Sequence, residues 1–426
     1  MGNLLKDARC ITDMVEPFSR VRLTWKGRRL EGILTPGTET MRLKLDSGYN
    51  IGLLASEVSD IEVLAPPPTH PAPSNSRSDG PILLIHTGGT IASKVDYASG
   101  AVYPSFSSEE LVAAYPELEE LGPLRTLELG NIVSEDVRFS HINAIAKAID
   151  EHRSDDSLKG IIVTHGTDTM HYTAAALSFM LGRLEKPVIL VGAQRSSDRP
   201  STDARLNLLS AALAVPSLAP AVYVCMHDSI HEERCRIILG VSARKMHSSR
   251  RDAFESVNRP VVGYVDFERR HVETEPFELP QSEARCELLD ESLRIGVLVS
   301  RPNLFADEVS RYSSYDGLIV EGSGFGHLPV SADADPENGR ILEAIEALTH
   351  AIPVFMTRRT IGGVTNLNVY TPGRRLREAG VLGHGCDCTP EAAYVKLAWA
   401  LSHHREDVDV VMERNVAGEC TPARDA

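Results

Sequence analysis

Short apolar runs that do not alternate with polar residues constrain this chain more than any other feature. Residues 82–85 read Ile-Leu-Leu-Ile and residues 188–191 read Val-Ile-Leu-Val. A strand that exposes one face to water alternates apolar and polar residues, whereas a strand buried on both faces does not. Similar runs recur at 161–163, 222–224, 295–299, 317–320 and 353–356. Because helical stretches such as 141–152 and 173–184 separate the runs, the pattern predicts an α/β fold with mostly parallel sheets.

The first 64 residues show a different pattern, in which apolar and polar residues alternate. Candidate strands, separated by turns that contain glycine or proline, lie at 21–25, 30–34, 41–45 and 49–53. Short alternating strands of this kind are typical of small antiparallel sheets and barrels. We therefore expect a small N-terminal β-barrel over residues 1–64.

The remaining 362 of the 426 residues divide by composition. Residues 65–80 are rich in proline and serine and predict a semi-rigid linker. A polar, proline-containing interval at about 268–285 then separates two sets of buried runs. We expect an N-terminal α/β lobe over 81–275 and a C-terminal α/β lobe over 290–426.

The charge of the chain bears on its partners. Lys and Arg total 44 against 59 Asp and Glu, so the net charge is −15. Most affinity for nucleic acid comes from contacts with phosphate, so we expect a second subunit to supply any RNA-binding surface. No apolar run approaches the roughly 20 residues that cross a bilayer. The first residues also lack the apolar stretch of a secretory signal, and we expect a cytoplasmic protein without membrane contact.

Seven cysteines are present, and Cys386-Asp387-Cys388 contains the only close pair. No histidines or second pair accompany it at the spacing of zinc ligands. We therefore favour ordinary thiols over a zinc site and expect no metal in this chain. No motif indicates an organic cofactor either.

A glycine turn after the first buried run carries the first candidate for catalysis. Residues 86–90 read His-Thr-Gly-Gly-Thr. Ligands of open α/β sheets bind beyond the carboxyl ends of the strands, and glycines let the backbone approach a ligand closely. Backbone N–H groups near Gly89 could bind a carboxylate or an oxyanion, with Thr90 beside them. The alternative is a simple turn in which Thr90 caps a helix.

A second loop rich in hydroxyl groups follows the run at 161–163. In it Thr167 and Asp168 are adjacent. A threonine hydroxyl is a weak nucleophile and needs a base, and a desolvated lysine oriented by a carboxylate can be that base. Lys245 is our candidate because lysine is rare in this arginine-rich chain. Helix capping by Asp168 or Thr169 is the alternative.

These two loops resemble the two signatures of the L-asparaginase family. Residues 87–92 read Thr-Gly-Gly-Thr-Ile-Ala, and residues 165–170 read His-Gly-Thr-Asp-Thr-Met. The resemblance implies two α/β lobes and an enzyme that hydrolyses the side-chain amide of a small amino acid and releases ammonia. It also implies the catalytic residues, which are Thr90 as the nucleophile and Thr167, Asp168 and Lys245 as a second catalytic group.

The resemblance extends to residues that would surround the substrate. Tyr97 matches the tyrosine of a mobile loop over the site, and Ser134 and Glu135 match positions that hold the α-carboxylate and α-amino groups. Gly89 would add backbone contacts to the substrate. From the residues alone, Tyr97 could equally be an exposed aromatic, and Ser134 with Glu135 a solvated turn.

Residues 43–52 and 95–104 resemble more closely the D subunits of archaeal-type glutamyl-tRNA(Gln) amidotransferases. This resemblance implies a glutaminase subunit, a homodimer within a heterotetramer, that passes ammonia to a partner, the E subunit of the same enzyme. The partner would bind Glu-tRNA(Gln) and use ATP and Mg, so that tRNA is bound mainly through it. The alternatives are a free-standing cytosolic L-asparaginase or glutaminase and, third, a catalytically silent protein built on this fold.

Overall fold

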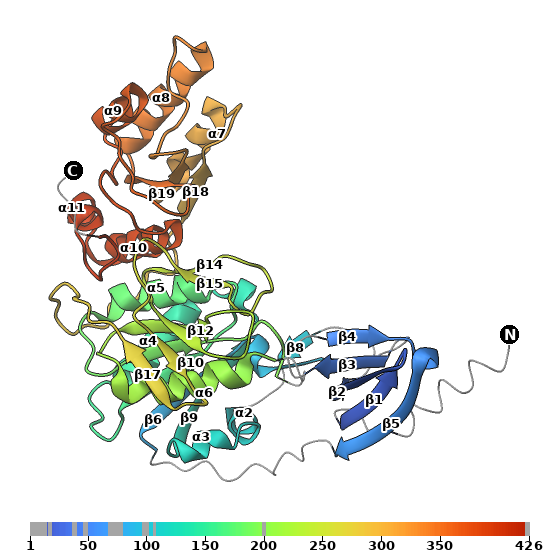
Figure 1. Ribbon diagram of the computed structural model, residues 1–426. Coiled ribbons are helices and arrows are strands. Elements are labelled where there is room, and N and C mark those ends of the chain that lie inside the picture. The colour runs from blue at the N-terminus through green and yellow to red at the C-terminus, as the bar shows by residue number, and fades with distance from the viewer. Residues whose placement is uncertain are drawn as a thin grey trace.

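Three groups of elements follow one another along the chain (Figure 1). The structure is a computed structural model, and the residues that it describes are 15, 19–35, 41–45, 50–66, 80–95, 102–104, 108–197 and 202–421. Each group has an apolar core, and the core of the second group also includes Ile295, Ile319 and Phe355 of the third. The expected α/β fold with mostly parallel sheets is confirmed in the second and third groups.

The N-terminal group is a five-stranded antiparallel sheet in the order β4-β3-β2-β1-β5. Its strands are β1 (Arg20–Trp25), β2 (Arg28–Thr35), β3 (Met41–Leu45), β4 (Asn50–Leu53) and β5 (Val58–Ala65). Register shifts between β1 and β5 bend the sheet, and Leu23, Leu43 and Leu53 are buried on one of its faces. The described residues include no pairing between β4 and β5 that would close the expected barrel.

The second group is built on an eight-stranded sheet in the order β17-β16-β13-β12-β11-β10-β6-β9. Its strands are β6 (Ile82–Gly88), β9 (Leu124–Ile132), β10 (Gly160–Thr164), β11 (Val188–Val191), β12 (Val222–His227), β13 (Cys235–Leu239), β16 (Gly263–Asp266) and β17 (His271–Thr274). Neighbours from β9 to β12 are parallel, and β13, β16 and β17 continue the sheet antiparallel. The four residues of β11 are all buried, as the unbroken apolar run predicts.

Helices cover both faces of this sheet, with α4 and α5 on one face and α6 on the other (Figure 1). The helices are α2 (Ser108–Ala113), α3 (Glu117–Glu120), α4 (Phe139–Glu151), α5 (Met170–Leu181) and α6 (Ala204–Ala214). In α4, Ile142, Ile145 and Ile149 recur at helical spacing and are buried. Two short hairpins stand outside the sheet, β7 (Ser93–Val95) with β8 (Val102–Pro104), and β14 (Ala243–Lys245) with β15 (Phe254–Ser256).

The third group is a parallel sheet in the order β18-β19-β20 with its own helices. Its elements are β18 (Ile295–Val299), β19 (Gly317–Gly322), β20 (Val354–Arg358), α7 (Ala306–Ser310), α8 (Pro336–Thr349) and α9 (Thr371–Glu378). Asp335 caps α8, since its side chain accepts a hydrogen bond from the backbone N–H of Glu337, and Pro336 occupies the first helical position.

The last two helices, α10 (Pro390–His403) and α11 (Val408–Glu413), belong to the core of the second group although they follow the third. Helix α10 packs against α5, and the Trp399 and Phe179 rings are stacked with their centroids 6.0 Å apart. The Trp399 indole N–H donates to Glu287 Oε2 at 2.8 Å. Among the residues described, no helix combines the length and apolar character of a membrane span.

Candidate active site

Three parallel strands bring the two hydroxyl-rich loops to one edge of the large sheet. Strand β6 lies between β9 and β10, with His86 opposite Thr164 and Gly88 opposite Ile132. The Thr87 hydroxyl donates to the Thr164 carbonyl at 2.7 Å, which ties the ends of β6 and β10 together. The loops that leave these strands therefore start side by side, as expected at the carboxyl edge of a parallel sheet.

Glycines let these loops touch through their backbones. Gly89 has φ +85°, and a Cβ atom built on it would lie 2.4 Å from the backbone nitrogen of Gly166. A Cβ on Gly166 would lie 2.6 Å from Ser134 Cβ. Since Thr90 follows Gly89 and Thr167 follows Gly166, the structure places both threonines beside this contact. A side chain at either glycine would force the loops apart.

Lys245, at the end of β14, joins the second loop through its ammonium group. Its Nζ donates to Thr167 Oγ1 at 2.7 Å and to Asp168 Oδ1 at 2.6 Å. The Lys245 side chain is 9% exposed, whereas that of Asp168 is 62% exposed. An ammonium has donors only, so the Thr167 hydroxyl accepts here.

Ser134 links the third loop to the second. Its Oγ accepts a hydrogen bond from the Asp168 backbone N–H at 3.1 Å, and its carbonyl accepts one from Thr169 Oγ1 at 2.7 Å. The Ser134 hydroxyl proton remains available to a ligand, because it is not used in accepting. Glu135 follows in the 3₁₀ helix η3 (Ser134–Asp136), and its side chain is exposed.

Thr90 begins a short 3₁₀ helix, η2 (Thr90–Ala92), and is partly exposed. The turn around it is fixed, because Ser93 Oγ donates to the Gly89 carbonyl at 2.8 Å and the Ser197 hydroxyl donates to the Ile91 carbonyl. Tyr97 lies outside the described residues, so its predicted position over the site stays a prediction.

Buried histidines lie beneath the second loop. The His165 ring bonds to the Gly166 carbonyl through Nδ1 at 2.7 Å and to Thr173 Oγ1 through Nε2 at 2.9 Å. Burial lowers the pKa of His165 to about 4, so the ring is neutral near pH 7, donates from Nδ1 and accepts at Nε2. Its role is to hold the loop rather than to exchange protons.

Glu391, which no sequence pattern singles out, reaches this region from α10. Its Oε1 lies 3.1 Å from Arg244 Nη2, and Arg244 is the residue before Lys245. His171 Nε2 is 4.0 Å from the same oxygen. Because burial lowers the pKa of His171 to about 3, that ring is neutral, and 4.0 Å is too long for a hydrogen bond. The Arg244–Glu391 pair therefore fixes β14 against α10.

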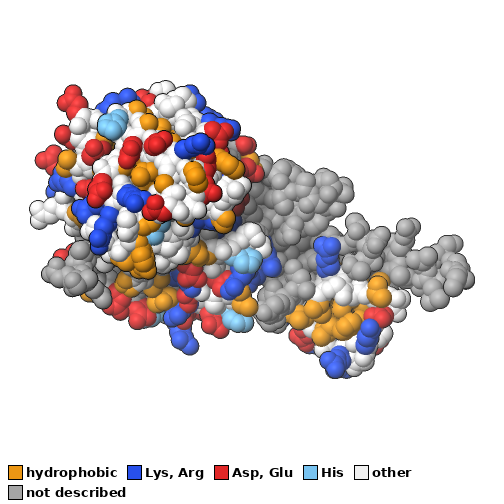
Figure 2. Space-filling view, turned by 90° about the horizontal axis from the view of Figure 1, so that it is seen from above, with side chains coloured by type: hydrophobic (Ala, Val, Ile, Leu, Met, Phe, Trp, Pro, Cys, Tyr) orange, Lys and Arg blue, Asp and Glu red, His pale blue; other side chains and the backbone are white. Residues whose placement is uncertain are grey.

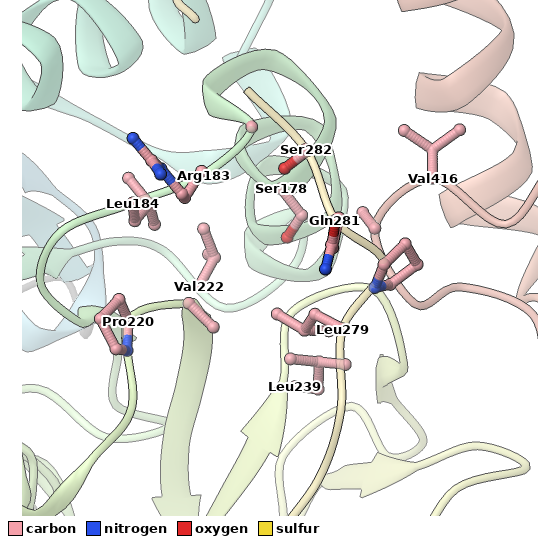
Figure 3. A pocket seen from close by; sticks show the side chains of 14 residues that line it. Ser178, Arg183, Leu184, Pro220, Val222, Leu239, Leu279, Gln281, Ser282 and Val416 are labelled. Atoms are coloured by element: carbon pink, nitrogen blue, oxygen red, sulfur yellow. The ribbon is translucent and has the colours of Figure 1, made fainter. Parts of the chain in front are cut away.

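A cavity of about 510 Å³ lies away from these loops (Figure 3). It includes Val222, the first residue of β12, together with Arg183, Leu279 and Gln281. This position is at the amino end of the parallel strands, opposite the edge where Thr90 and Thr167 lie. The cavity therefore does not belong to the candidate active site.

Comparisons with known families cover most of the chain. The family models that match are Asparaginase, N-terminal, over 81–278, Glutaminase/Asparaginase C-terminal domain, over 296–412, and GatD N-terminal domain, over 15–64. The first match contains both hydroxyl-rich loops and Lys245.

Individual proteins resemble the chain over nearly its whole length. The D subunit of the glutamyl-tRNA(Gln) amidotransferase of Archaeoglobus fulgidus is 41% identical over 411 residues, 95% of each chain. The D subunit from Pyrococcus horikoshii is 42% identical over 409 residues, 91% of this chain and 89% of the relative. Among solved structures, the thermostable L-asparaginase of Thermococcus kodakarensis matches with a TM-score of 0.69 and 31% identity, covering 80% of this chain and 99% of its own.

Proposed function

Because the chain belongs to the L-asparaginase family and, within it, to the D subunits of glutamyl-tRNA(Gln) amidotransferases, we propose that it is the glutaminase subunit of a tRNA-dependent amidotransferase. The observation that carries its chemistry is the group formed by Thr167, Asp168 and Lys245 beside the Gly89–Thr90 turn. A nucleophile, a proton acceptor and close-lying backbone N–H groups are what amide hydrolysis requires.

The proposed reaction has two steps. Thr90 Oγ attacks the side-chain carbonyl carbon of glutamine and gives up its proton to a base of the site. The C–N bond then breaks, the nitrogen takes up a proton, and ammonia leaves while the glutamyl group stays esterified to Thr90. Water attacks this ester with Thr167 and Lys245 accepting its proton, which releases glutamate and restores the Thr90 hydroxyl.

Ser134 and Glu135 are proposed to hold the amino-acid end of the substrate. The Ser134 hydroxyl can donate to the α-carboxylate while it accepts from the Asp168 N–H. The exposed Glu135 carboxylate can accept from the α-ammonium. The Gly89 N–H donates to the Ile132 carbonyl at 3.1 Å, so Gly89 would contribute by letting the Thr90 backbone approach the substrate closely. Tyr97 would cover the site and exclude water.

The E subunit of the amidotransferase is the proposed partner, in a heterotetramer that contains a homodimer of this chain in the cytoplasm. The partner would bind Glu-tRNA(Gln) and hold the ATP and Mg that activate its glutamyl carboxylate. The net charge of −15 supports leaving most tRNA contacts to the partner. Figure 2 shows acidic side chains interspersed with basic ones over the face seen from above.

Ammonia release tests this function. We expect little release from glutamine by the purified chain alone, and a sharp rise when the E subunit, Glu-tRNA(Gln) and ATP are added. High activity alone, with a preference for asparagine and no response to the additions, would identify a free-standing L-asparaginase. The similarity to a solved L-asparaginase supports the free-standing enzyme as a second candidate. The match of residues 15–64 to the GatD N-terminal domain favours the amidotransferase subunit.

A Thr90→Val substitution tests the nucleophile separately. Valine keeps the shape of the side chain without the hydroxyl, so amide hydrolysis should fall by about a thousandfold or more at an unchanged melting temperature. Thr274→Val, at an exposed position of β17, is the matched control and should keep full activity. Normal ammonia release by the Thr90 variant would show that Thr90 is not the nucleophile. It would leave the proposed substrate unchanged.

A further inference from the structure

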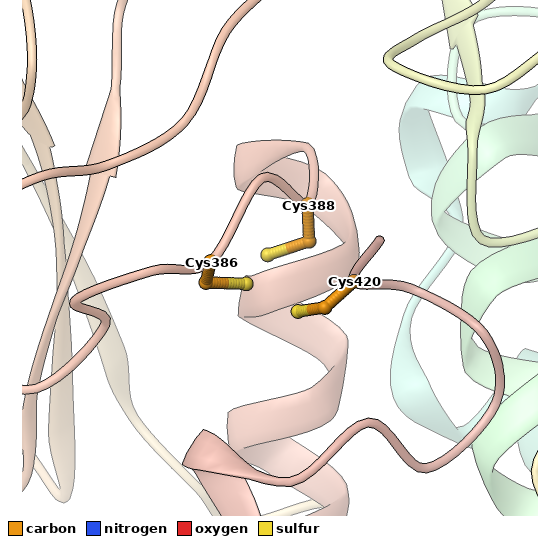
Figure 4. A group of neighbouring side chains, drawn as sticks. All are labelled: Cys386, Cys388 and Cys420. Carbon is orange, nitrogen blue, oxygen red and sulfur yellow. The ribbon is translucent and has the colours of Figure 1, made fainter. Parts of the chain in front are cut away.

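Three cysteine side chains converge in the C-terminal part of the chain (Figure 4). Cys386 and Cys388 lie in the loop before α10, and Cys420 comes from the segment after α11. Their Sγ atoms all lie within 4.8 Å of one another, and none of the three is in a disulfide. Cys386 and Cys388 are buried, and Cys420 is partly exposed. The sequence shows only the first two as neighbours, and the fold adds the third.

We propose that these three thiols bind a single zinc ion as thiolates, with water or a small ligand in the fourth position. Zinc bonds to cysteine sulfur at about 2.3 Å, which sets tetrahedral sulfur atoms about 3.8 Å apart. Sulfur atoms already within 4.8 Å need to move by no more than about 1 Å to reach that geometry. Ligands made only of thiolate favour zinc over the hard cations Mg²⁺ and Ca²⁺.

The backbone of the site is held in place without the metal. Arg358 donates to the Asp387 carbonyl at 2.6 Å and to the Cys388 carbonyl at 3.3 Å, and Asn258 Nδ2 also donates to the Asp387 carbonyl at 2.6 Å. The Asp387 carboxylate accepts from the Thr421 backbone N–H at 2.8 Å, which brings the segment after α11 to the loop. The three thiols are thus preorganised, so that binding a metal ion requires little rearrangement.

The charges around the cluster fit an anionic centre. The Arg358 side chain is buried, and among the described residues it makes no ion pair with a carboxylate. Lys396, the other buried cation nearby, is already paired with Glu419 at 2.6 Å. Zinc with three thiolates carries one negative charge, which would add to that of the Asp387 carboxylate in balancing the guanidinium of Arg358.

Bound zinc would connect the start of α10 to the segment that follows α11. Helix α10 carries Glu391, which pairs with Arg244 beside Lys245. The metal would therefore be structural and would stabilise the wall of the candidate active site without taking part in its chemistry. The three cysteines lie outside that site, so zinc binding is independent of the proposed function.

Metal analysis of the purified full-length chain tests the proposal. After expression in medium with zinc, we expect about one zinc per chain that survives dialysis, and each of Cys386→Ser, Cys388→Ser and Cys420→Ser should lower retained zinc about tenfold or more. Cys286→Ser, a partly exposed cysteine outside the cluster, is the control and should retain the metal. Retention of zinc by all three cluster variants would overturn the proposal.

A second measurement does not depend on how the variants fold. The wild-type chain loaded with Co²⁺ should show thiolate-to-cobalt charge-transfer absorption, which zinc should abolish by displacement. Alkylation of the native chain followed by mass spectrometry should find Cys420, the partly exposed member of the cluster, protected until the metal is removed with a chelator. Equal alkylation of Cys420 before and after chelation, or a disulfide between Cys420 and either partner, would overturn the zinc site.

Discussion

Lys245 bonds to two oxygen atoms of the second loop at once, and this arrangement allows its chemical role to be tested. Lys245→Met should lower amide hydrolysis by about a hundredfold to ten-thousandfold, because Thr167 loses the neighbour that we propose as its proton acceptor. Lys245→Arg should be about as damaging, since arginine keeps the charge but does not deprotonate in proteins. The measurement is kcat for ammonia release by the two variants.

The arginine variant separates two roles for Lys245. A role as a fixed positive charge predicts that arginine restores most activity, because an ion pair with Asp168 can still form. Recovery by arginine to near the wild-type rate would therefore rule out the base assignment. Lys159→Arg, at a position outside these loops, controls for the exchange of residue type.

The buried, neutral histidine His171 makes stability depend on pH. Its pKa is lowered to about 3 by burial, against 6.5 in an ordinary environment. Between these two pH values the ring is protonated in the unfolded chain and neutral in the folded chain. Its contribution to stability is complete above pH 6.5 and is lost as pH falls from there toward 3. Between about pH 7 and about pH 5 the loss from this one ring is about 2 kcal/mol.

His171→Phe removes this titration and keeps a ring beside Tyr172, whose centroid is 4.9 Å away. Urea unfolding at about pH 7 and about pH 5 should show a difference in unfolding free energy about 2 kcal/mol smaller in the variant than in the wild type. An equal difference in both proteins would show that His171 binds a proton in the folded chain.

At the scale of elements, the contact between two loops depends on glycine. Gly89→Ala places a Cβ where the Gly166 backbone nitrogen is 2.4 Å away and also strains a residue with φ +85°. We expect the turn carrying Thr90 to move and kcat to fall about a hundredfold. Gly130→Ala, in β9, is the matched control because the nearest atoms to its Cβ are 3.8 Å away. Equal activity of both variants would show that the close approach is dispensable.

The strands of both lobes can be predicted from the sequence because burial on two faces leaves a local signature. The runs at 188–191 and 295–299 coincide with β11, which is buried throughout, and with β18, an edge strand in which only Val297 is exposed. Strand β9 has no such signature, since it lies at one edge of its sheet and mixes apolar with charged residues, as at Arg125 and Glu128. The end of a predicted strand also locates the loops, which is why Thr90 and Thr167 can be proposed from the sequence.

Contacts between distant segments leave no local signature. Rarity and the family resemblance point to Lys245, and only the fold shows it 2.7 Å from Thr167. Glu391 looks like an ordinary acidic residue in the first turn of a helix, although it is buried against Arg244. Cys420 is 32 residues beyond Cys388, a separation that no ligand spacing rule covers. The catalytic roles of the site residues stay predictions until the variants are measured.

At the scale of the whole molecule, the three cores lead us to expect that one truncation leaves the stability of the chain nearly unchanged and that another abolishes cooperative unfolding. A chain of residues 80–426 loses only the N-terminal core, so the melting temperature of the remainder should change by no more than about 4 °C. A chain of residues 80–389 loses α10 and α11, whose buried side chains include Leu397 and Trp399. Each such side chain contributes roughly 1.5–3 kcal/mol, which is large beside a net stability of about 5–15 kcal/mol.

The shorter chain should therefore not unfold cooperatively, as measured by circular dichroism during heating. A cooperative transition in residues 80–389 near the wild-type temperature would show that α10 is an accessory to the large core. Loss of that transition in residues 80–426 would show instead that the N-terminal sheet supports the lobes.

The return of α10 to the first lobe also sets an order of events during protein synthesis. The described residues of the candidate site lie between 89 and 245, and they leave the ribosome well before Pro390–His403 is made. Until then α5 has no helix to cover its apolar face, and Arg244 has no Glu391. A growing chain thus carries the candidate catalytic side chains in an incomplete core, and we expect it not to hydrolyse glutamine until translation is nearly complete.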